Sequence, residues 1–237
     1  MVTGKVLGAV LIVLAQQQLP SNPPGLRAGD WRYSANVELG AQRQDLGVRS
    51  VTVAPTSGDQ GPSWLVVMTM QIEGQPFTDS VVMLRSDLKP VSRHAVATGT
   101  DLLLVTDDSM AHGLFTAGTS VTPLNVPLGP RSFLNYYALR AAFPELSLAR
   151  GWVGTASVLE LGGDPTFATL TLSVVDTERI TVPAGEVDCW HLTVKGPAGI
   201  DEHYWVGKDR QEVIRTREPI GGRGAIMQLD LVSFTPH

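Results

Sequence analysis

Short runs of apolar, β-branched and aromatic residues recur along the chain from residue 29 onward, separated by Gly, Pro and Asp. Apolar and polar residues alternate within the later runs, as in Trp190, Leu192 and Val194, and this period of two is typical of strands. The pattern predicts strands over Asp30–Leu39, Val48–Pro55, Trp64–Ile72, Thr78–Arg85, Val91–Ala97, Leu102–Thr106 and Ala111–Phe115, and then over Trp152–Leu161, Phe167–Val182, Glu186–Lys195, Glu202–Val206, Glu212–Arg217 and Ala225–Phe234. Brief turn sequences join many neighbours, which favours antiparallel hairpins.

One helix is predicted between the two series of strands, over Ser132–Phe143. Leu134, Tyr137, Ala138 and Ala141 recur there at i, i+3, i+4 and i+7, with Ser132 as N-cap. The preceding segment, residues 122–130, is apolar but too rich in proline for a central strand. We therefore expect a mainly β fold of antiparallel curved sheets, as a half-barrel or as two β lobes, with one connecting helix.

The N-terminus has the pattern of a secretory signal peptide. Lys5 precedes an apolar run over Val6–Leu14, which is too short to span a bilayer, and Ala15 offers a small-residue cleavage site. A buried first strand is the alternative. We expect a signal peptide over 1–15, a linker over 16–28, and one β-rich domain over 29–237, whose halves (29–116 and 151–237) are joined by a loop-helix segment over 117–150. The expected location is periplasmic or secreted, with no integral membrane segment in the mature chain.

Charge and cysteine content narrow the classes of partner. Lys and Arg number 18 against 23 Asp and Glu, so the net charge of -5 argues against nucleic acid as a partner. The one cysteine, Cys189, allows no internal disulfide, and no cysteine follows the apolar run, so we expect no acylated N-terminal cysteine. Its apolar surroundings favour a buried strand thiol over a nucleophile.

Motifs that specify a reaction are missing from the sequence. It contains no Gly-x-Ser-x-Gly elbow, no HExxH helix and no paired cysteines at metal-ligand spacing. His191 and His203 lie on consecutive predicted strands, and a hairpin could bring them together. A metal-dependent hydrolase would need both rings within about 8 Å of each other, together with a carboxylate. We predict that the protein is not an enzyme, with no catalytic, cofactor-binding or metal-ligating residues.

Two stretches of the second half resemble a known family. The segment Glu178–Leu192 carries Val182-Pro183-Ala184-Gly185, and His203–Asp209 carries Tyr204-Trp205-Val206-Gly207-Lys208-Asp209. This pattern resembles the bacterial family of secreted or periplasmic proteins known as domain of unknown function 3108. In the first half, Gln71–Gly74, Asp79-Ser80 and Leu88–Ser92 fit it too. The resemblance implies an envelope location, an antiparallel fold and a noncatalytic role, and its curved sheets are similar to those with which lipoprotein carriers hold acyl chains.

Four aromatic residues are candidates for lining a ligand pocket: Trp190, Trp205, Tyr137 and Trp152. Trp190 and Trp205 are the expected inward-facing pair, although all four could equally form an ordinary core. The first hypothesis is a noncatalytic cell-envelope protein that binds a lipid or other hydrophobic small molecule on a curved sheet. It predicts an apolar cavity of a few hundred cubic ångströms. The alternative is an envelope protein-interaction or structural module, which would expose an apolar surface patch to a partner protein.

Overall fold

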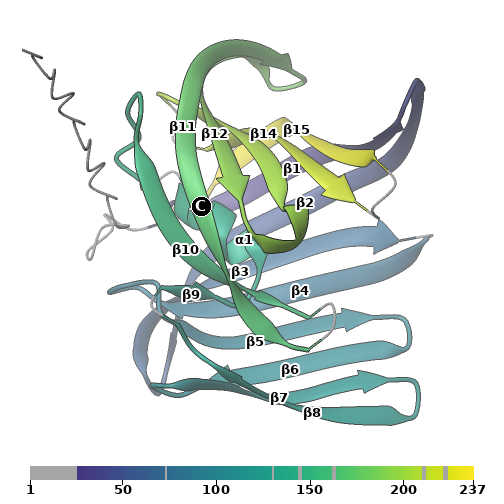
Figure 1. The fold of residues 1–237 in the computed structure, drawn as a ribbon, viewed down its shortest axis with the longest axis vertical. Helices are drawn as coiled ribbons and strands as arrows, with labels where there is room; N and C mark the ends of the chain where they lie inside the picture. The colour runs from purple at the N-terminus through teal and green to yellow at the C-terminus, as the bar shows by residue number, and fades with distance from the viewer. Residues whose placement is uncertain are drawn as a thin grey trace, which may run out of the picture.

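The computed structural model describes residues 26–72, 74–129, 131–143, 146–161, 164–209, 212–220 and 224–237, and these form one curved sheet of fifteen strands (Figure 1). Its strands are β1 (Gly29–Leu39), β2 (Gln42–Gly58), β3 (Gly61–Ile72), β4 (Gln75–Leu84), β5 (Pro90–Ala97), β6 (Thr100–Thr106), β7 (Met110–Ala117), β8 (Ser120–Pro127), β9 (Ser132–Phe133), β10 (Val153–Glu160), β11 (Thr166–Val182), β12 (Gly185–Lys195), β13 (Asp201–Gly207), β14 (Val213–Ile220) and β15 (Ala225–Pro236). A helix, α1 (Tyr136–Ala142), and a short 3-10 turn, η2 (Pro197–Gly199), complete the described elements.

The strands follow one another through the sheet in the order β8 to β1, then β15 down to β9. The first and last of the described strands therefore pair at the middle of the sheet, and the two halves share one continuous hydrogen-bonded surface. Every pair of neighbours is antiparallel except β9 and β10. The predicted mainly β, antiparallel and curved fold with one connecting helix is confirmed.

The concave face of the sheet carries the apolar core. Register places Val53, Val66 and Val81 side by side on β2, β3 and β4, and all three are buried. Leu192 and Tyr204 are a similar buried pair on β12 and β13. Helix α1 contacts β3 as well as β9 and β10. In Figure 1, β10 and β11 pass in front of it, so that the helix lies inside the curve of the sheet. Burial of each large apolar side chain contributes about 2 kcal/mol to folding.

The helix begins later than predicted, at Tyr136. Its N-cap is Asn135, whose side-chain oxygen accepts a 2.8 Å hydrogen bond from the backbone N–H of Ala138. Ser132 is not the cap because Ser132 and Phe133 pair with Ser157 and Val158 of β10 as the short strand β9. The helical spacing of apolar residues therefore begins about one turn before the helix itself, because the first residues of the predicted helix form strand β9.

The loop-helix segment predicted over 117–150 contains a strand that the pattern missed. Strand β8 lies at one end of the sheet, where Pro123 needs no hydrogen-bond partner on its outer side. The prediction that this stretch is not a central strand therefore agrees with the position of β8 at the edge of the sheet.

The N-terminal predictions, a signal peptide over 1–15 and a linker over 16–28, fall almost entirely outside the described residues, which begin at Leu26. Among the residues that the structure does describe, no helix has the length and apolar character needed to cross a bilayer.

Candidate functional site

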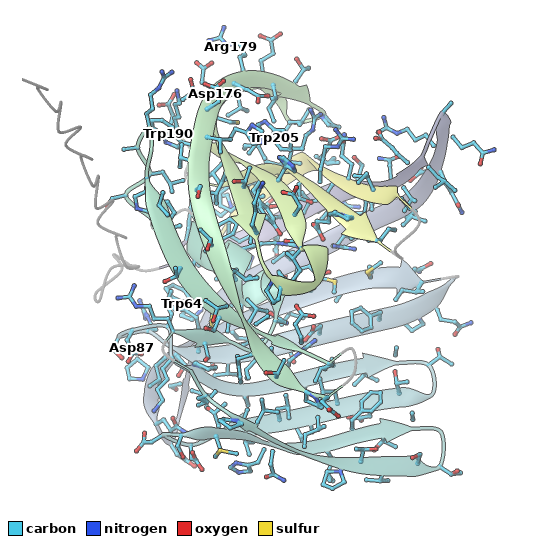
Figure 2. The ribbon with its side chains drawn as sticks, viewed as in Figure 1. Trp64, Asp87, Asp176, Arg179, Trp190 and Trp205 are labelled. Atoms are coloured by element: carbon cyan, nitrogen blue, oxygen red, sulfur yellow. The ribbon has the colours of Figure 1, made fainter. Side chains whose placement is uncertain are left out.

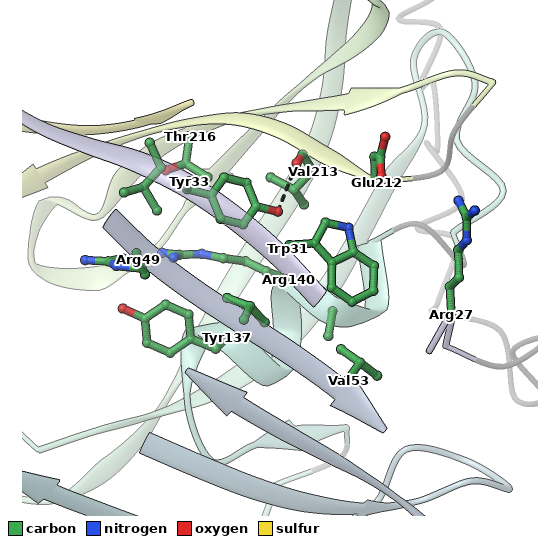
Figure 3. Close-up of a pocket in the computed structure, with 13 residues that line it drawn as sticks. Arg27, Trp31, Tyr33, Arg49, Val53, Tyr137, Arg140, Glu212, Val213 and Thr216 are labelled. Atoms are coloured by element: carbon green, nitrogen blue, oxygen red, sulfur yellow. Dashed lines mark hydrogen bonds between the residues drawn. The ribbon is translucent and has the colours of Figure 1, made fainter. Parts of the chain in front are cut away.

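A cavity lies between α1 and the concave face of the sheet (Figure 3). Its volume is about 60 Å³, room for about four water molecules at roughly 15 Å³ each. It is lined by Trp31 and Tyr33 of β1, Arg49, Val51 and Val53 of β2, Val213 and Thr216 of β14, Leu229 of β15, Tyr137, Arg140 and Ala141 of α1, and by Arg27 and Glu212. The wall is mostly aromatic and aliphatic, as expected of a site for a small organic molecule.

Strand geometry explains how β1 and β2 contribute to the cavity. Side chains two residues apart share a face, and register pairs Tyr33 with Arg49 and Trp31 with Val51. Arg49, Val51 and Val53 thus project together from β2 toward the helix. The side chain of Arg49 therefore lies at an inward position of a central strand.

Arg49 is the most unusual side chain in the cavity. The residue is only 2% exposed, yet its Nε and Nη1 atoms have no hydrogen-bond acceptor among the described residues. Its Nη2 lies 3.1 Å from the Sδ atom of Met227, a weak acceptor. Its guanidinium carbon lies 5.4 Å from the centre of the Tyr137 ring. A guanidinium keeps its charge in proteins, and burying a charge without a partner is unfavourable.

Arg140, the second buried arginine of the cavity, has partners. Its Nη2 lies 2.7 Å from Oε2 of Glu218, and its Nε donates a 3.1 Å hydrogen bond to the hydroxyl of Tyr204. Thr216 donates to the other oxygen of Glu218 at 2.7 Å, and the Tyr204 hydroxyl donates to Glu202. These groups form a connected polar network beneath α1.

Arg27 and Glu212 line both the cavity and a larger, more open hollow next to it. The hollow has a volume of about 380 Å³, and both residues line it together with Ala184, Leu231, Val232, Ser233 and Phe234. In Figure 3, Arg27 and Arg49 lie at opposite ends of the cavity, with Trp31 between them. At about 60 Å³, the cavity itself is smaller than the predicted few hundred cubic ångströms.

The structure brings one of the four predicted lining residues to the cavity, Tyr137. Trp205 lies on the opposite face of β13 from the buried Tyr204, with its ring stacked on His191 at 4.6 Å. Trp190 is half-buried, with the ammonium nitrogen of Lys208 4.5 Å from its ring centre, and Trp152 is part of the buried core. Figure 2 shows Trp190 and Trp205 in the upper part of the molecule.

His191 and His203 do come together, within a polar cluster on β12 and β13. Nε2 of His191 lies 2.9 Å from Nδ1 of His203, and Nδ1 of His191 lies 2.9 Å from Oε1 of Glu178. The indole N–H of Trp205 donates to the second oxygen of Glu178 at 3.0 Å. Burial and the neighbouring His191 lower the pKa of His203 below its ordinary value. The two rings therefore satisfy the distance requirement set for a hydrolase, although neither lines the cavity.

The other candidate chemistry has an ordinary structural setting. Cys189 is buried, and burial raises the pKa of its thiol to about 12. A thiol with so high a pKa is a weak nucleophile at neutral pH. No group of three or more His, Cys, Asp or Glu side chains among the described residues is arranged to hold a metal ion.

Comparisons with known proteins connect the chain to an uncharacterised group. Residues 32–229 match the family model described as "Protein of unknown function (DUF3108)". The solved structures that resemble the chain include the hypothetical lipoprotein YmcC from Escherichia coli (15% identity, TM-score 0.36), covering 94% of this chain and 92% of that one. A protein from Bacteroides fragilis, assigned as exported and with a YmcC-like fold, has 11% identity and a TM-score of 0.33 over 90% and 98% of the two chains.

A third solved structure, from Parabacteroides distasonis and assigned as a lipoprotein, has 14% identity and a TM-score of 0.33, covering 93% of this chain and all of that one (100%). A search of curated proteins gave no match.

Proposed function

Because the chain belongs to the DUF3108 family of proteins of unknown function, we propose its role from its own geometry: a noncatalytic protein of the cell envelope that binds a hydrophobic small molecule, such as an acyl chain, within its curved sheet. The observation that carries this proposal is the aromatic and aliphatic cavity under α1, which adjoins an open hollow beyond Arg27 and Glu212. The cavity has room for one end of a chain, and the hollow has room for more of its length. The predicted signal peptide over 1–15 supports the envelope location.

Two features support a noncatalytic role. The Glu178, His191 and His203 side chains form hydrogen bonds mainly with one another and with Trp205, on residues that do not line the cavity. Cys189 is buried with a raised thiol pKa. General acid–base or nucleophilic catalysis needs such groups within reach of a bound substrate.

The first test is native mass spectrometry of the mature protein, purified from an envelope fraction without detergent and then extracted with organic solvent. We expect an extra mass that extraction removes. Replacing Ala141, which lines the cavity from α1, by Leu should greatly reduce that mass because the added carbons occupy the space. Leu is a good helix former, so the helix itself is little perturbed.

The matched control is Ala117→Leu, which makes the same change at an exposed position of β7 and should retain the extra mass. A wild-type protein without any extractable mass, or equal retention by both variants, would contradict the proposal.

An apolar patch on the first half of the sheet favours a second candidate function, a protein-interaction module. Leu103 of β6 and Leu114 of β7 are a directly paired couple, 51% and 49% exposed. Val105 and Val121 are exposed on the same face, as the register of β6, β7 and β8 requires. Adjoining exposed apolar side chains of this kind are typical of contact surfaces.

This second function predicts that replacing Leu103 and Leu114 by Lys abolishes a specific cross-link to an envelope protein in intact cells. Because both side chains are exposed, each change should alter the free energy of unfolding by only about 0.5 kcal/mol. The equally exposed Val175 of β11, replaced by Lys, is the control. An unchanged cross-linking pattern in the double variant would argue against the module.

A further inference from the structure

We propose that the hydrophobic ligand is a long-chain carboxylate, and that its head group pairs with Arg49 at the inner end of the cavity. This inference rests on the proposed function and adds the chemical class of the ligand. Arg49 is a 2% exposed side chain that lines the cavity, with Nε and Nη1 lacking an acceptor among the described residues. Its guanidinium presents N–H donors in a fork that matches the two oxygens of a carboxylate.

The buried acidic groups on the same face already have other partners. Asp79 accepts two hydrogen bonds from Arg93, at 3.0 and 2.8 Å. Glu218 accepts from Arg140 and from Thr216. Arg49 therefore has no ion pair among the described residues, and a bound anion would supply the missing charge.

The charge of the cavity wall favours a monoanion. Among the lining residues, Arg27, Arg49 and Arg140 face one carboxylate, Glu212, and Glu218 lies directly behind Arg140. Arg140 is already paired with Glu218 and lies near Glu202, whereas the buried Arg49 has Nε and Nη1 without an acceptor among the described residues. A flat carboxylate with a single charge would pair with Arg49 and suits a cavity of about 60 Å³. A phosphate head group is bulkier and brings additional charge.

The tail of such a ligand has an apolar route toward solvent. From Arg49, the wall continues along Val51, Val53 and Trp31 to Arg27. Beyond Arg27, the hollow is lined by Leu231 and Phe234, among others. The charged end would thus lie deepest, and the chain would extend outward toward the hollow.

The test compares three ligands of equal chain length: dodecanoate, dodecanol and dodecyl phosphate. Binding to the delipidated full-length mature protein is measured by titration calorimetry and by the fluorescence of tryptophan, since Trp31 lines the cavity. We expect dodecanoate to bind about 10- to 100-fold more tightly than dodecanol, because only its carboxylate forms a charge-assisted hydrogen bond with Arg49. Dodecyl phosphate should bind less tightly than dodecanoate.

Variants of Arg49 test the assignment independently. Arg49→Met should remove the preference for dodecanoate over dodecanol while preserving dodecanol binding, and Arg49→Lys should restore only part of it because lysine lacks the fork. Without ligand, Arg49→Met should raise Tm, since a buried charge is removed, whereas an arginine with a purely structural role would lower Tm when removed. Arg179→Met, an exposed arginine paired with Asp188, is the control and should change neither quantity.

Each outcome has a distinct meaning. Equal binding of dodecanoate and dodecanol to the wild type would overturn the carboxylate assignment and leave the proposed function intact. Tighter binding of dodecyl phosphate would replace the carboxylate by a phosphate head group. Binding of none of the three would count against the proposed function as well. If Arg49→Met fails to fold, the ligand comparison on the wild type and Arg49→Lys still decide the question.

Discussion

Replacing Arg140 by Met is expected to lower the free energy of unfolding by about 3–5 kcal/mol, the range typical of breaking a buried ion pair from one side. The change leaves Glu218 buried without its cation, which lies 2.7 Å away, and removes the donor to the hydroxyl of Tyr204. Arg140 and Glu218 are both almost fully buried, so water cannot readily replace the lost partner.

Urea unfolding followed by circular dichroism would measure this effect. The double variant Arg140→Met with Glu218→Leu should recover much of the loss, because it removes the uncompensated carboxylate as well. Arg179→Met, which breaks the exposed pair with Asp188, should cost at most about 1 kcal/mol. A loss below about 1 kcal/mol for Arg140→Met would show that the network beneath α1 does not stabilise the fold.

The strands could be predicted from the sequence because each combines a local period of two with a turn at its end. Thirteen of them were expected, and those such as β1 and β5 agree with the structure to within a residue at each end. Strands β8 and β9 were missed for different reasons. Strand β8 contains proline, which an edge position tolerates, and β9 is two residues long, too short to show any period.

Polar residues on the last strand were harder to interpret. Alternation correctly separates Leu229 and Leu231 from Gln228 and Asp230, and predicts that the polar pair faces water. The structure buries both polar residues, because Gln228 donates to Asp230 at 2.8 Å and Arg215 pairs with Asp230. Alternation alone therefore misplaces these two polar residues, because a hydrogen bond within β15 and an ion pair from β14 satisfy them inside the protein.

The cavity could hardly be predicted from the sequence, because its walls come from strands and a helix that are far apart in the chain. Arg49 shares the parity of Val51 and Val53, so the three side chains share one face of β2, but the strand pattern alone does not show that this face is the inward one. Trp205 and its neighbour Tyr204 are both buried, on opposite faces of β13, and Trp205 packs against His191 instead of lining the cavity. Which face of a strand lies toward the helix depends on how distant strands pair. A short stretch of sequence does not contain that information.

The stability of the wild type should depend on pH through Glu202, and Glu202→Gln should remove that dependence. Burial raises the pKa of Glu202 to about 7 from its ordinary 4.5; Arg140 opposes this shift, and Glu218 adds to it. The folded state thus binds a proton more tightly than the unfolded state does. Wild-type stability from this group should be greatest below pH 4.5, fall as pH rises toward 7, and level off above it, by up to about 3 kcal/mol in all.

The difference in unfolding free energy between wild type and Glu202→Gln, measured in urea from pH 4.5 to pH 8, isolates this residue because contributions of other groups largely cancel. The free energy of unfolding of the variant should increase relative to that of the wild type as pH rises, and the variant should be the more stable of the two at pH 8. Glu186→Gln, at an exposed position of β12, should show no such trend. A difference that stays constant with pH would mean that the Glu202 carboxylate is ionised throughout, with the Tyr204 hydroxyl and Arg140 compensating its burial in full. If the trend is confirmed, the protonation state of Glu202 regulates the network that holds Arg140 at the cavity wall. Ligand affinity should then vary over the same pH interval.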